Sequence, residues 1–433
     1  MLKTGNKINT LIIGFFLLTF VSVSCKKKKE DDNSLLLLGA LMLSQQFHVT
    51  ERMAIIEGAG TVAANEALAL AVANTIVNYA KTIDETATHG FPFQWIVAGQ
   101  SEDTTAITST TSNLLVRPPA TLTKDGTTYT VKGNVVELCN SGYASAAMGT
   151  GKFHAPALPC KVQVWADHTN NKIYVDMTDP RSIFRLFFSD VTDPSTLKDT
   201  KGNVVNPQTV YIEIQTVVKT ALAAQANIRW ETSAIGPAVT AADAKGTEKP
   251  YVVEKWLDSG ATAVTASDAA KKILDALGTD GINGTATGMT AAKTAAEGWR
   301  NARVAGTAGT GTFGTTLTSS YALSFPLGIK IIEPCSPKYA KTAMKYGMWH
   351  VGALPCKVAV YEDGGALYVS YLNPKFMFNV LFRDATIDAA DVTMVDNVKA
   401  DIHSIVKQAL TGAAVTGGTL KTTPDDVTAT VVK

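Results

Sequence analysis

An internal duplication is the strongest constraint on the fold of this sequence of 433 residues. Residues 139–165 align without gaps to residues 335–361 at a constant offset of 196, and 14 of the 27 positions are identical. Two residues are missing from the second copy in the next turn, and the match then continues as far as Asp190 and Asp384. Self-similarity at a fixed spacing is the signature of a repeated structural unit. The sequence therefore predicts two divergent copies of one domain.

Both copies predict the same order of elements. A short helix follows the first cysteine of each copy, with Asn140 and Ser336 as N-cap residues and Pro337 in the first turn. Alternating apolar residues then predict a hairpin, and a 3–4 spacing predicts a closing helix. These elements are expected at 161–165, 173–177 and from Pro207 onward in the first copy, and at 357–361, 367–372 and 395–410 in the second. An upstream strand and helix are expected at 54–56 and 63–80, and at 251–256 and 267–277.

Composition divides the chain into six segments. They are a signal peptide (1–24), a lipidated tether (25–47), a first domain (48–226), a linker (227–249), a second domain (250–412) and a C-terminal tail (413–433). The stretches Ser101–Thr130 and Gly278–Ser320 are rich in Thr, Ser, Ala and Gly, and they fall at equivalent places in the two copies. Connections of this length are unusual within a compact domain, so we expect them to be functional or mobile insertions.

The repeated motif resembles a known family. The second copy contains Cys335-Ser-Pro-Lys-Tyr-Ala, then Leu354-Pro-Cys-Lys-Val-Ala-Val-Tyr-Glu, and this pattern resembles the DUF302 family, also called TT1751-like. The first copy keeps the two cysteines but has Ser141 in place of the proline and Trp165-Ala166 in place of Tyr-Glu. The resemblance implies an α+β fold of two tandem TBP-like domains, each an antiparallel-rich sheet with helices on one face. It implies no chemistry.

The N-terminus has the three regions of a secretory signal. Lys3 and Lys7 precede an uncharged apolar run at residues 11–21, and small residues lead to Cys25. That run is shorter than the roughly 20 residues of a membrane-spanning helix. Cys25 in the context Val-Ser-Val-Ser-Cys resembles the relaxed lipobox of spirochaetal lipoproteins, which implies a covalent lipid on its thiol. An ordinary secretory signal with an unrelated cysteine is the alternative.

The segment after Cys25 suits a membrane anchor. Residues 26–33 are charged and cannot form a core, as expected for a solvated tether, and the apolar run 35–43 has only nine residues. We therefore expect the protein to be lipid-anchored in the cell envelope, at the outer membrane or the periplasmic face, with the bilayer as one partner. The net charge of +1 provides no basic field for nucleic acid.

Each copy carries the pattern Cys-x14-His-x5-Cys, formed by Cys139, His154 and Cys160 in the first copy and by Cys335, His350 and Cys356 in the second. Three interpretations compete with plain burial, in which a free cysteine packs as a small hydrophobic side chain. One disulfide in each copy would close a loop of about 20 residues and contribute on the order of 3 kcal/mol. A reduced thiol pair would use the lowered pKa of a cysteine at a helix start, lowered further by the histidine. A zinc or copper site would lack an evident fourth ligand, so we expect no metal cofactor.

No catalytic motif accompanies these residues. The chain has no Gly-x-Ser-x-Gly, no His-Glu-x-x-His and no phosphate-binding Gly-Lys-Ser/Thr. A non-enzymatic binding or structural role is therefore favoured, with an unknown protein or small molecule as partner, although the sequence leaves enzymatic activity open. The alternative function is envelope thiol-redox chemistry or metal handling by the Cys/His/Cys sets. The duplication also allows the two domains to pack against each other as an intramolecular pseudo-dimer.

Overall fold

The computed structural model describes residues 46–80, 82, 95–101, 122–124, 127–129, 133–158, 160–191, 205–260, 265–277, 300–301, 323–324, 326–353 and 356–432. The predicted signal peptide, Cys25 and the tether up to residue 45 lie outside these residues, as do most of the two predicted insertions. Residues 46–433 form one unit by their contacts. Within the described residues, no helix is both long enough and apolar enough to cross a bilayer.

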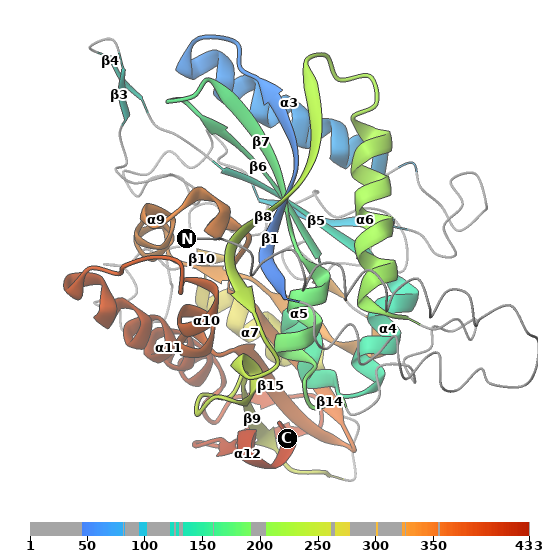
Figure 1. Ribbon diagram of the computed structural model, residues 1–433. Coiled ribbons are helices and arrows are strands. Elements are labelled where there is room, and N and C mark those ends of the chain that lie inside the picture. The colour runs from blue at the N-terminus through green and yellow to red at the C-terminus, as the bar shows by residue number, and fades with distance from the viewer. Residues whose placement is uncertain are drawn as a thin grey trace, which may run out of the picture. The chain divides into compact units, whose positions relative to one another are not determined.

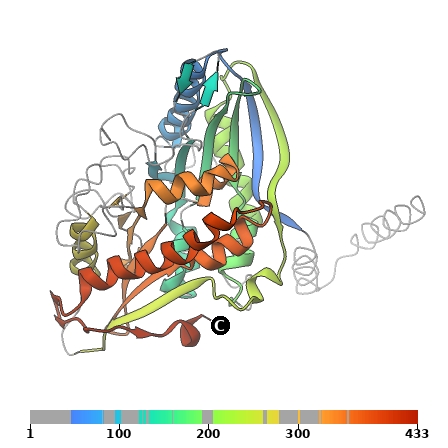
Figure 2. The ribbon, with the colours of Figure 1, turned by 90° about the vertical axis from the view of Figure 1, so that its left-hand side faces the viewer.

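Two antiparallel sheets of six strands have the same strand order. The first runs β2-β5-β6-β7-β1-β8 and the second β11-β12-β14-β15-β9-β18. The strands of the first sheet are β1 (Phe47–Glu57), β2 (Trp95–Ser101), β5 (Gly133–Asn140), β6 (Cys160–Asp167), β7 (Lys172–Thr178) and β8 (Ile228–Val239). Those of the second are β9 (Tyr251–Leu257), β11 (Leu323–Ser324), β12 (Lys330–Ile332), β14 (Val358–Asp363), β15 (Ala366–Leu372) and β18 (Asp425–Asp426). Figure 2 shows β1 and β8 running side by side at the edge of the first sheet.

Long helices cover one face of each sheet (Figure 1). They are α3 (Val62–Ala80) and α6 (Pro207–Ala221) in the first copy, and α7 (Ala266–Leu277) and α11 (Ala389–Leu410) in the second. Alternate strand residues point to the same face, and in β6 the buried side chains of Val162 and Val164 pack into the core under α3 and α6. Val358 and Val360 of β14 do the same under α7 and α11. The predicted α+β class, with helices on one face of each sheet, is confirmed.

The helix after the first cysteine of each copy begins where the N-cap residues predict. In α4 (Ser141–Gly149), the side chain of Asn140 accepts hydrogen bonds from the backbone of residues 142 and 143. In α9 (Pro337–Lys345), the Ser336 side chain accepts from the backbone of residue 339. Each helix is followed by a 3₁₀ helix, η1 (Lys152–Ala157) or η5 (Met348–Ala353).

One helix in the second half of each copy was not predicted, and the two helices begin in the same way. They are α5 (Pro180–Phe187) and α10 (Pro374–Leu381), and each has proline in its first turn. Asp179 and Asn373 supply the N-cap side chains. An Asx residue followed by proline is a strong helix start, so this signal was present in both copies of the sequence.

Two predicted segment boundaries are corrected by the structure. Residues 227–249, expected as a linker, contain β8, which pairs with β1. The strand is an edge strand with one exposed face, and its polar residues resemble those of a loop. Residues 413–433, expected as a tail, contain β16 (Ala414–Val415), β17 (Gly418–Thr419), β18 and α12 (Thr428–Val431), and β18 pairs with β9.

Short remaining elements are β3 (Leu122–Lys124), β4 (Thr127–Tyr129), β10 (Arg300–Asn301), β13 (Pro334–Cys335), η3 (Asp243–Lys245) and η4 (Pro326–Gly328).

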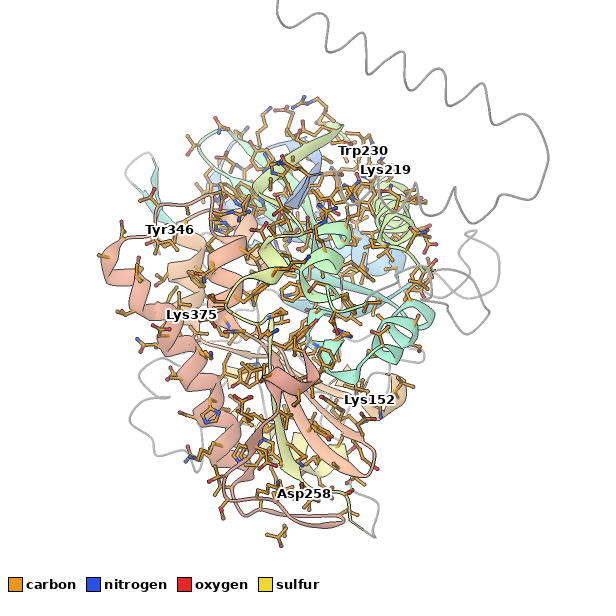
Figure 3. All side chains as sticks on the ribbon, turned by 60° about the horizontal axis from the view of Figure 1, so that its bottom comes forward. Lys152, Lys219, Trp230, Asp258, Tyr346 and Lys375 are labelled. Carbon is orange, nitrogen blue, oxygen red and sulfur yellow. The ribbon has the colours of Figure 1, made fainter. Side chains whose placement is uncertain are left out.

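The second face of each sheet packs against the other copy. Helix η1 of the first copy contacts β14, β15 and β9, and helix η5 of the second copy contacts β5, β6, β7 and β8. The Phe153 ring on η1 meets the Tyr251 ring edge-on at 5.4 Å between centroids. Lys152 Nζ, labelled in Figure 3, donates to the backbone oxygen of Glu362 at 2.5 Å. The two copies therefore bury their open sheet faces reciprocally.

Candidate ligand site between the two domain copies

The four repeat cysteines lie in, or just before, strands of the two copies. Cys139 is the penultimate residue of β5 and Cys160 is the first residue of β6, and the register places residue 138 opposite Cys160. Cys335 ends β13, and Cys356 lies two residues before the start of β14. All four are free thiols in the structure. The structure therefore has no disulfide among the described residues, and the pairing of Cys139 with Cys160 and of Cys335 with Cys356 stays a prediction.

Burial changes the acidity of these thiols in the direction opposite to the prediction. Removal from water raises the pKa of Cys139, raises that of Cys160 to about 12 and raises that of Cys356 to about 11. Burial disfavours a thiolate because the charged form loses its hydration. The nearby helix N-terminus favours a thiolate, but Cys139 lies one residue before the N-cap, inside a buried strand, where loss of hydration has the larger effect. The thiol-redox interpretation loses its main support.

We predict that these thiols alkylate very slowly in the folded protein. At pH 8, a thiol of pKa about 12 carries a thiolate fraction about three orders of magnitude below that of an ordinary cysteine. Peptide mapping after a timed pulse of iodoacetamide should show Cys160 and Cys356 unmodified in the native protein and modified in 6 M guanidinium chloride. Rapid alkylation of the native protein, or absence of alkylation in the unfolded protein before reduction, would contradict the free, buried thiols.

The two repeated histidines are bound to carboxylates. His154 Nε2 lies 3.0 Å from Asp190 Oδ1, and His350 Nε2 lies 3.1 Å from Asp384 Oδ1. Among the residues that the structure describes, no group of three His, Cys, Asp or Glu side chains could hold a metal ion. The histidine and the two cysteines of each copy therefore do not meet as the ligand set that the sequence suggested.

The second ring nitrogen distinguishes the two histidines. Nδ1 of His154 lies 3.0 Å from the hydroxyl oxygen of Thr150. The equivalent of Thr150 in the second copy is Tyr346, labelled in Figure 3, whose hydroxyl donates instead to Asp391 at 2.5 Å. Nδ1 of His350 is buried and has no hydrogen-bond partner in the structure. In the second copy, therefore, this imidazole nitrogen lacks the hydrogen bond that its equivalent makes in the first copy.

A lysine and a glutamate form a buried ion pair across the two copies. Lys357 Nζ lies 3.0 Å from Glu137 Oε1 and donates to the backbone oxygen of Leu158 at 2.8 Å. Both side chains are at most 2% exposed. Desolvating two charges is costly unless each is paired and hydrogen-bonded, and this geometry pairs them.

Lys161 is the residue of the first copy that aligns with Lys357 of the second. Burial and the nearby Lys357 ammonium lower the pKa of Lys161 to about 8, while Glu137 and Glu333 act in the opposite direction. Sequence reasoning did not single out these four residues. The lysines are identical in the repeat, and the glutamates stand two residues before the first cysteine of each copy. Extending the alignment upstream by two residues would have found the glutamates.

A cavity of about 60 Å³ opens beside this cluster, and we call it the interdomain cavity. Its described lining comes from both copies: Val49, Thr50, Pro156, Ala157, Leu158, Cys160, Lys161, Thr178, Pro180, Ile183, Phe184, Phe187, Trp349, His350, Gly352, Ala353, Lys357, Leu372, Met377 and Leu381. Most of these residues are apolar. Within that lining, Lys161 and Lys357 carry charge and no carboxylate is present.

Comparison with known proteins agrees with the duplicated fold. The family described as Domain of unknown function DUF302 matches residues 117–204 and again residues 312–409. The chain thus contains two DUF302 domains in tandem. The crystal structure of an uncharacterized conserved DUF302 protein from Bacillus stearothermophilus is similar at 14% identity, with 41% of this chain and 96% of that chain covered and a TM-score of 0.22. No protein with a curated description matches the chain.

Proposed function

We propose that the protein is a lipid-anchored envelope protein that binds a small molecule in the interdomain cavity and is not an enzyme. The observation that carries this proposal is the cavity itself, which combines apolar walls from both copies with a few polar groups. Such a combination is typical of small-molecule sites, where apolar surface supplies affinity and a few polar groups orient the ligand. The raised pKa of the cavity thiol, Cys160, favours binding over nucleophilic chemistry.

Binding at this site can be tested with neutral alcohols. Trp349 lines the cavity, whereas Trp230, labelled in Figure 3, packs against the core on the helix side of the first sheet. Titration with methanol and ethanol, which fit a cavity of about 60 Å³, should therefore shift the indole N–H resonance of Trp349 saturably and leave that of Trp230 unchanged. Replacing Ala157 with phenylalanine fills part of the cavity and should abolish the shift. A shift that survives Ala157→Phe, or no saturable shift at all, would refute the proposed site.

The anchor is proposed from the N-terminal sequence. The basic start, the apolar run and Cys25 support lipidation, and the charged segment after Cys25 supports a tether. We predict that cells fed labelled palmitate will label the wild-type protein and that Cys25→Ala will lose essentially all of the label. Cys160→Ala is the matched control and should keep it. Unchanged labelling of Cys25→Ala would show that the lipid is elsewhere or absent.

A further inference from the structure

We propose that a groove on the second copy binds a small organic phosphate monoester, with the phosphoryl group held by Lys399, His403 and Lys407. The groove has a volume of about 400 Å³ and is lined by residues of α11, β9, β15 and β18. Small-molecule sites usually have volumes of about 300–1,000 Å³. The groove shares no described lining residue with the interdomain cavity, so this inference goes beyond the proposed function and does not rest on it.

A buried carboxylate fixes the orientation of the His403 ring. Oε1 of Glu254 on β9 lies 2.6 Å from Nδ1 of His403, and Oε2 accepts from Nε1 of Trp256 at 3.1 Å. An ionised carboxylate only accepts hydrogen bonds, so Nδ1 carries the proton. The other ring nitrogen, Nε2, points away from Glu254 and has no hydrogen-bond partner among the described residues. The His403 side chain is 43% exposed, which leaves Nε2 accessible to a ligand in the groove.

Two lysines flank His403 on the same face of α11. Lys399 and Lys407 stand four residues before and four residues after it, and both line the groove. Four residues rise about 6 Å along a helix, a distance that an extended lysine side chain spans. In the described part of the chain, neither ammonium group has a hydrogen bond or an ion pair. Both can therefore reach an anion bound at Nε2 of His403.

The carboxylates of the groove already have partners. Oδ1 of Asp396 lies 3.6 Å from Nζ of Lys375, which is labelled in Figure 3. Asp426 accepts a hydrogen bond from the backbone of residue 428 at 2.9 Å, and Glu254 is held by the ring of His403. The lining thus combines paired carboxylates with unpaired ammonium groups. This distribution favours an anionic ligand, because Lys and protonated His form strong charge-assisted hydrogen bonds with anions.

The first copy provides an internal comparison for this groove. Helices α6 and α11 align at a constant offset of 188, and six of the 16 positions over residues 207–222 are identical. Equivalent contacts support the alignment. Tyr143 donates to Glu213 of α6, and Tyr339, its partner in the repeat, donates to Asp401 of α11. Differences between the two helices therefore show what the second copy has gained.

The first copy holds a buried carboxylate without a cationic groove. Gln215 aligns with His403, and Tyr211 aligns with Lys399. Nε2 of Gln215 donates to Glu51 on β1 at 2.8 Å, and the hydroxyl of Tyr211 donates to the same carboxylate at 2.6 Å. An amide is thus sufficient to bind the strand carboxylate from this helix position. A histidine there adds a second ring nitrogen and a positive charge, and these serve a ligand.

Three donors around one point suit a phosphate monoester. Its phosphoryl group has three acceptor oxygens and a charge of about −1.5 to −2 at neutral pH, whereas a carboxylate has two oxygens and a single charge. Val252, Ala400 and Pro424 add apolar surface to the lining, where an aryl or alkyl group can pack. The monoester can belong to a free molecule or to a lipid headgroup, since the three donors meet the same phosphoryl group in both.

The closing experiment compares phenyl phosphate with benzoate and phenol by isothermal titration calorimetry on the purified protein. We expect phenyl phosphate to bind at least about tenfold more tightly than either, the equivalent of one lost charged hydrogen bond. Benzoate binding as tightly as phenyl phosphate would overturn the phosphate assignment. Equal binding of phenol would overturn the anion site.

Vesicles distinguish the two sources of the monoester. The protein is sedimented with phosphatidylcholine vesicles that contain or lack phosphatidic acid, whose headgroup is a phosphate monoester. Binding of phenyl phosphate without sedimentation supports a free ester. Sedimentation that requires phosphatidic acid and is lost in Lys399→Met supports a lipid headgroup. Neither sedimentation nor phenyl phosphate binding would refute the proposal.

Variants assign the phosphoryl group to its three donors. His403→Gln introduces the residue of the first copy, which keeps a donor for Glu254 and removes the charge. This variant and Lys399→Met should each bind phenyl phosphate about tenfold more weakly, with an unchanged circular dichroism spectrum. The matched control is Lys219→Met, because Lys219 of α6, labelled in Figure 3, aligns with Lys407. An equal loss in Lys219→Met would contradict the assignment.

The pH dependence of binding tests His403 separately. Its hydrogen bond to Glu254 raises the pKa of His403 above the ordinary value of about 6.5, and Lys407 opposes this shift. The charged or titratable groups of the groove are Glu254 of β9, Tyr371 of β15, Asp426 of β18, and Asp396, Lys399 and Lys407 of α11.

Phenyl sulfate is the probe for this test, because its own charge does not change between pH 6 and 9. Deprotonation turns Nε2 from a donor into an acceptor, so phenyl sulfate should bind more weakly as the pH rises through the pKa of His403. Binding to His403→Gln should stay constant over the same range. The same pH dependence in the wild type and in His403→Gln would refute the role of His403.

Discussion

Replacing Glu137 with alanine is expected to lower the free energy of unfolding by about 3–5 kcal/mol, since removing one partner of a buried ion pair leaves the other charge uncompensated. Here the charge left behind is the ammonium group of Lys357, which is 2% exposed and lies 3.0 Å from Glu137 in the structure. The two residues belong to different copies, so the variant also loosens the junction. Urea denaturation followed by circular dichroism measures the change, with the midpoint shifting at constant slope.

Two further variants separate the ion pair from simple loss of packing. The double variant Glu137→Met, Lys357→Met removes both charges and keeps apolar volume, so it should be more stable than Glu137→Ala. The matched control is Glu57→Ala, which breaks the ion pair of Lys172 with Glu57, whose side chain is 58% exposed. Exposed pairs contribute about 1 kcal/mol or less. If Glu137→Ala costs no more than Glu57→Ala, the buried pair does not stabilise the junction.

Short-range signals in the sequence were sufficient to predict most of the helices and hairpins. Asn140 and Ser336 were predicted as N-caps because capping involves only a side chain and the backbone two or three residues later. The strand β8 was missed because an edge strand needs apolar residues on one face only, and its pairing with β1 joins residues far apart in the sequence. The helices α5 and α10 were missed although their Asx-Pro starts are equally local.

The candidate site was predicted in part, because each of its groups depends on the other copy. The repeat identified the four cysteines and two histidines, but the raised pKa of the Cys139 thiol and the carboxylate partners of the histidines depend on packing that no spacing reveals. Lys161 and Lys357 are identical in the alignment of the two copies, but the sequence alone does not distinguish them from ordinary strand residues. Only the reciprocal packing of the two sheets places Lys357 against Glu137, so the sequence could show that these residues repeat and not that they meet.

Truncating Phe153 to alanine should lower the stability of both copies together, by about 3–5 kcal/mol, the usual cost of removing a buried phenylalanine ring. Phe153 belongs to η1 of the first copy, but its ring packs with Tyr251 of the second, and its backbone oxygen accepts a hydrogen bond from Ser370 on β15. A side chain that completes the core of the other copy couples the unfolding of the two. Hydrogen exchange at increasing urea should therefore show β6 and β14 losing protection in one coincident transition.

The reciprocal variant tests the same coupling from the other side. Met348 of η5 is 1% exposed and packs with Val135 and Trp165 of the first sheet. Met348→Ala should cost about 2–5 kcal/mol and should again lower the protection of β6 and β14 together. Two separate transitions, or a loss confined to the copy that carries the substitution, would show that each domain folds alone. The interdomain cavity would then lie between independently stable domains, and ligand binding would have to supply the free energy that holds its walls together.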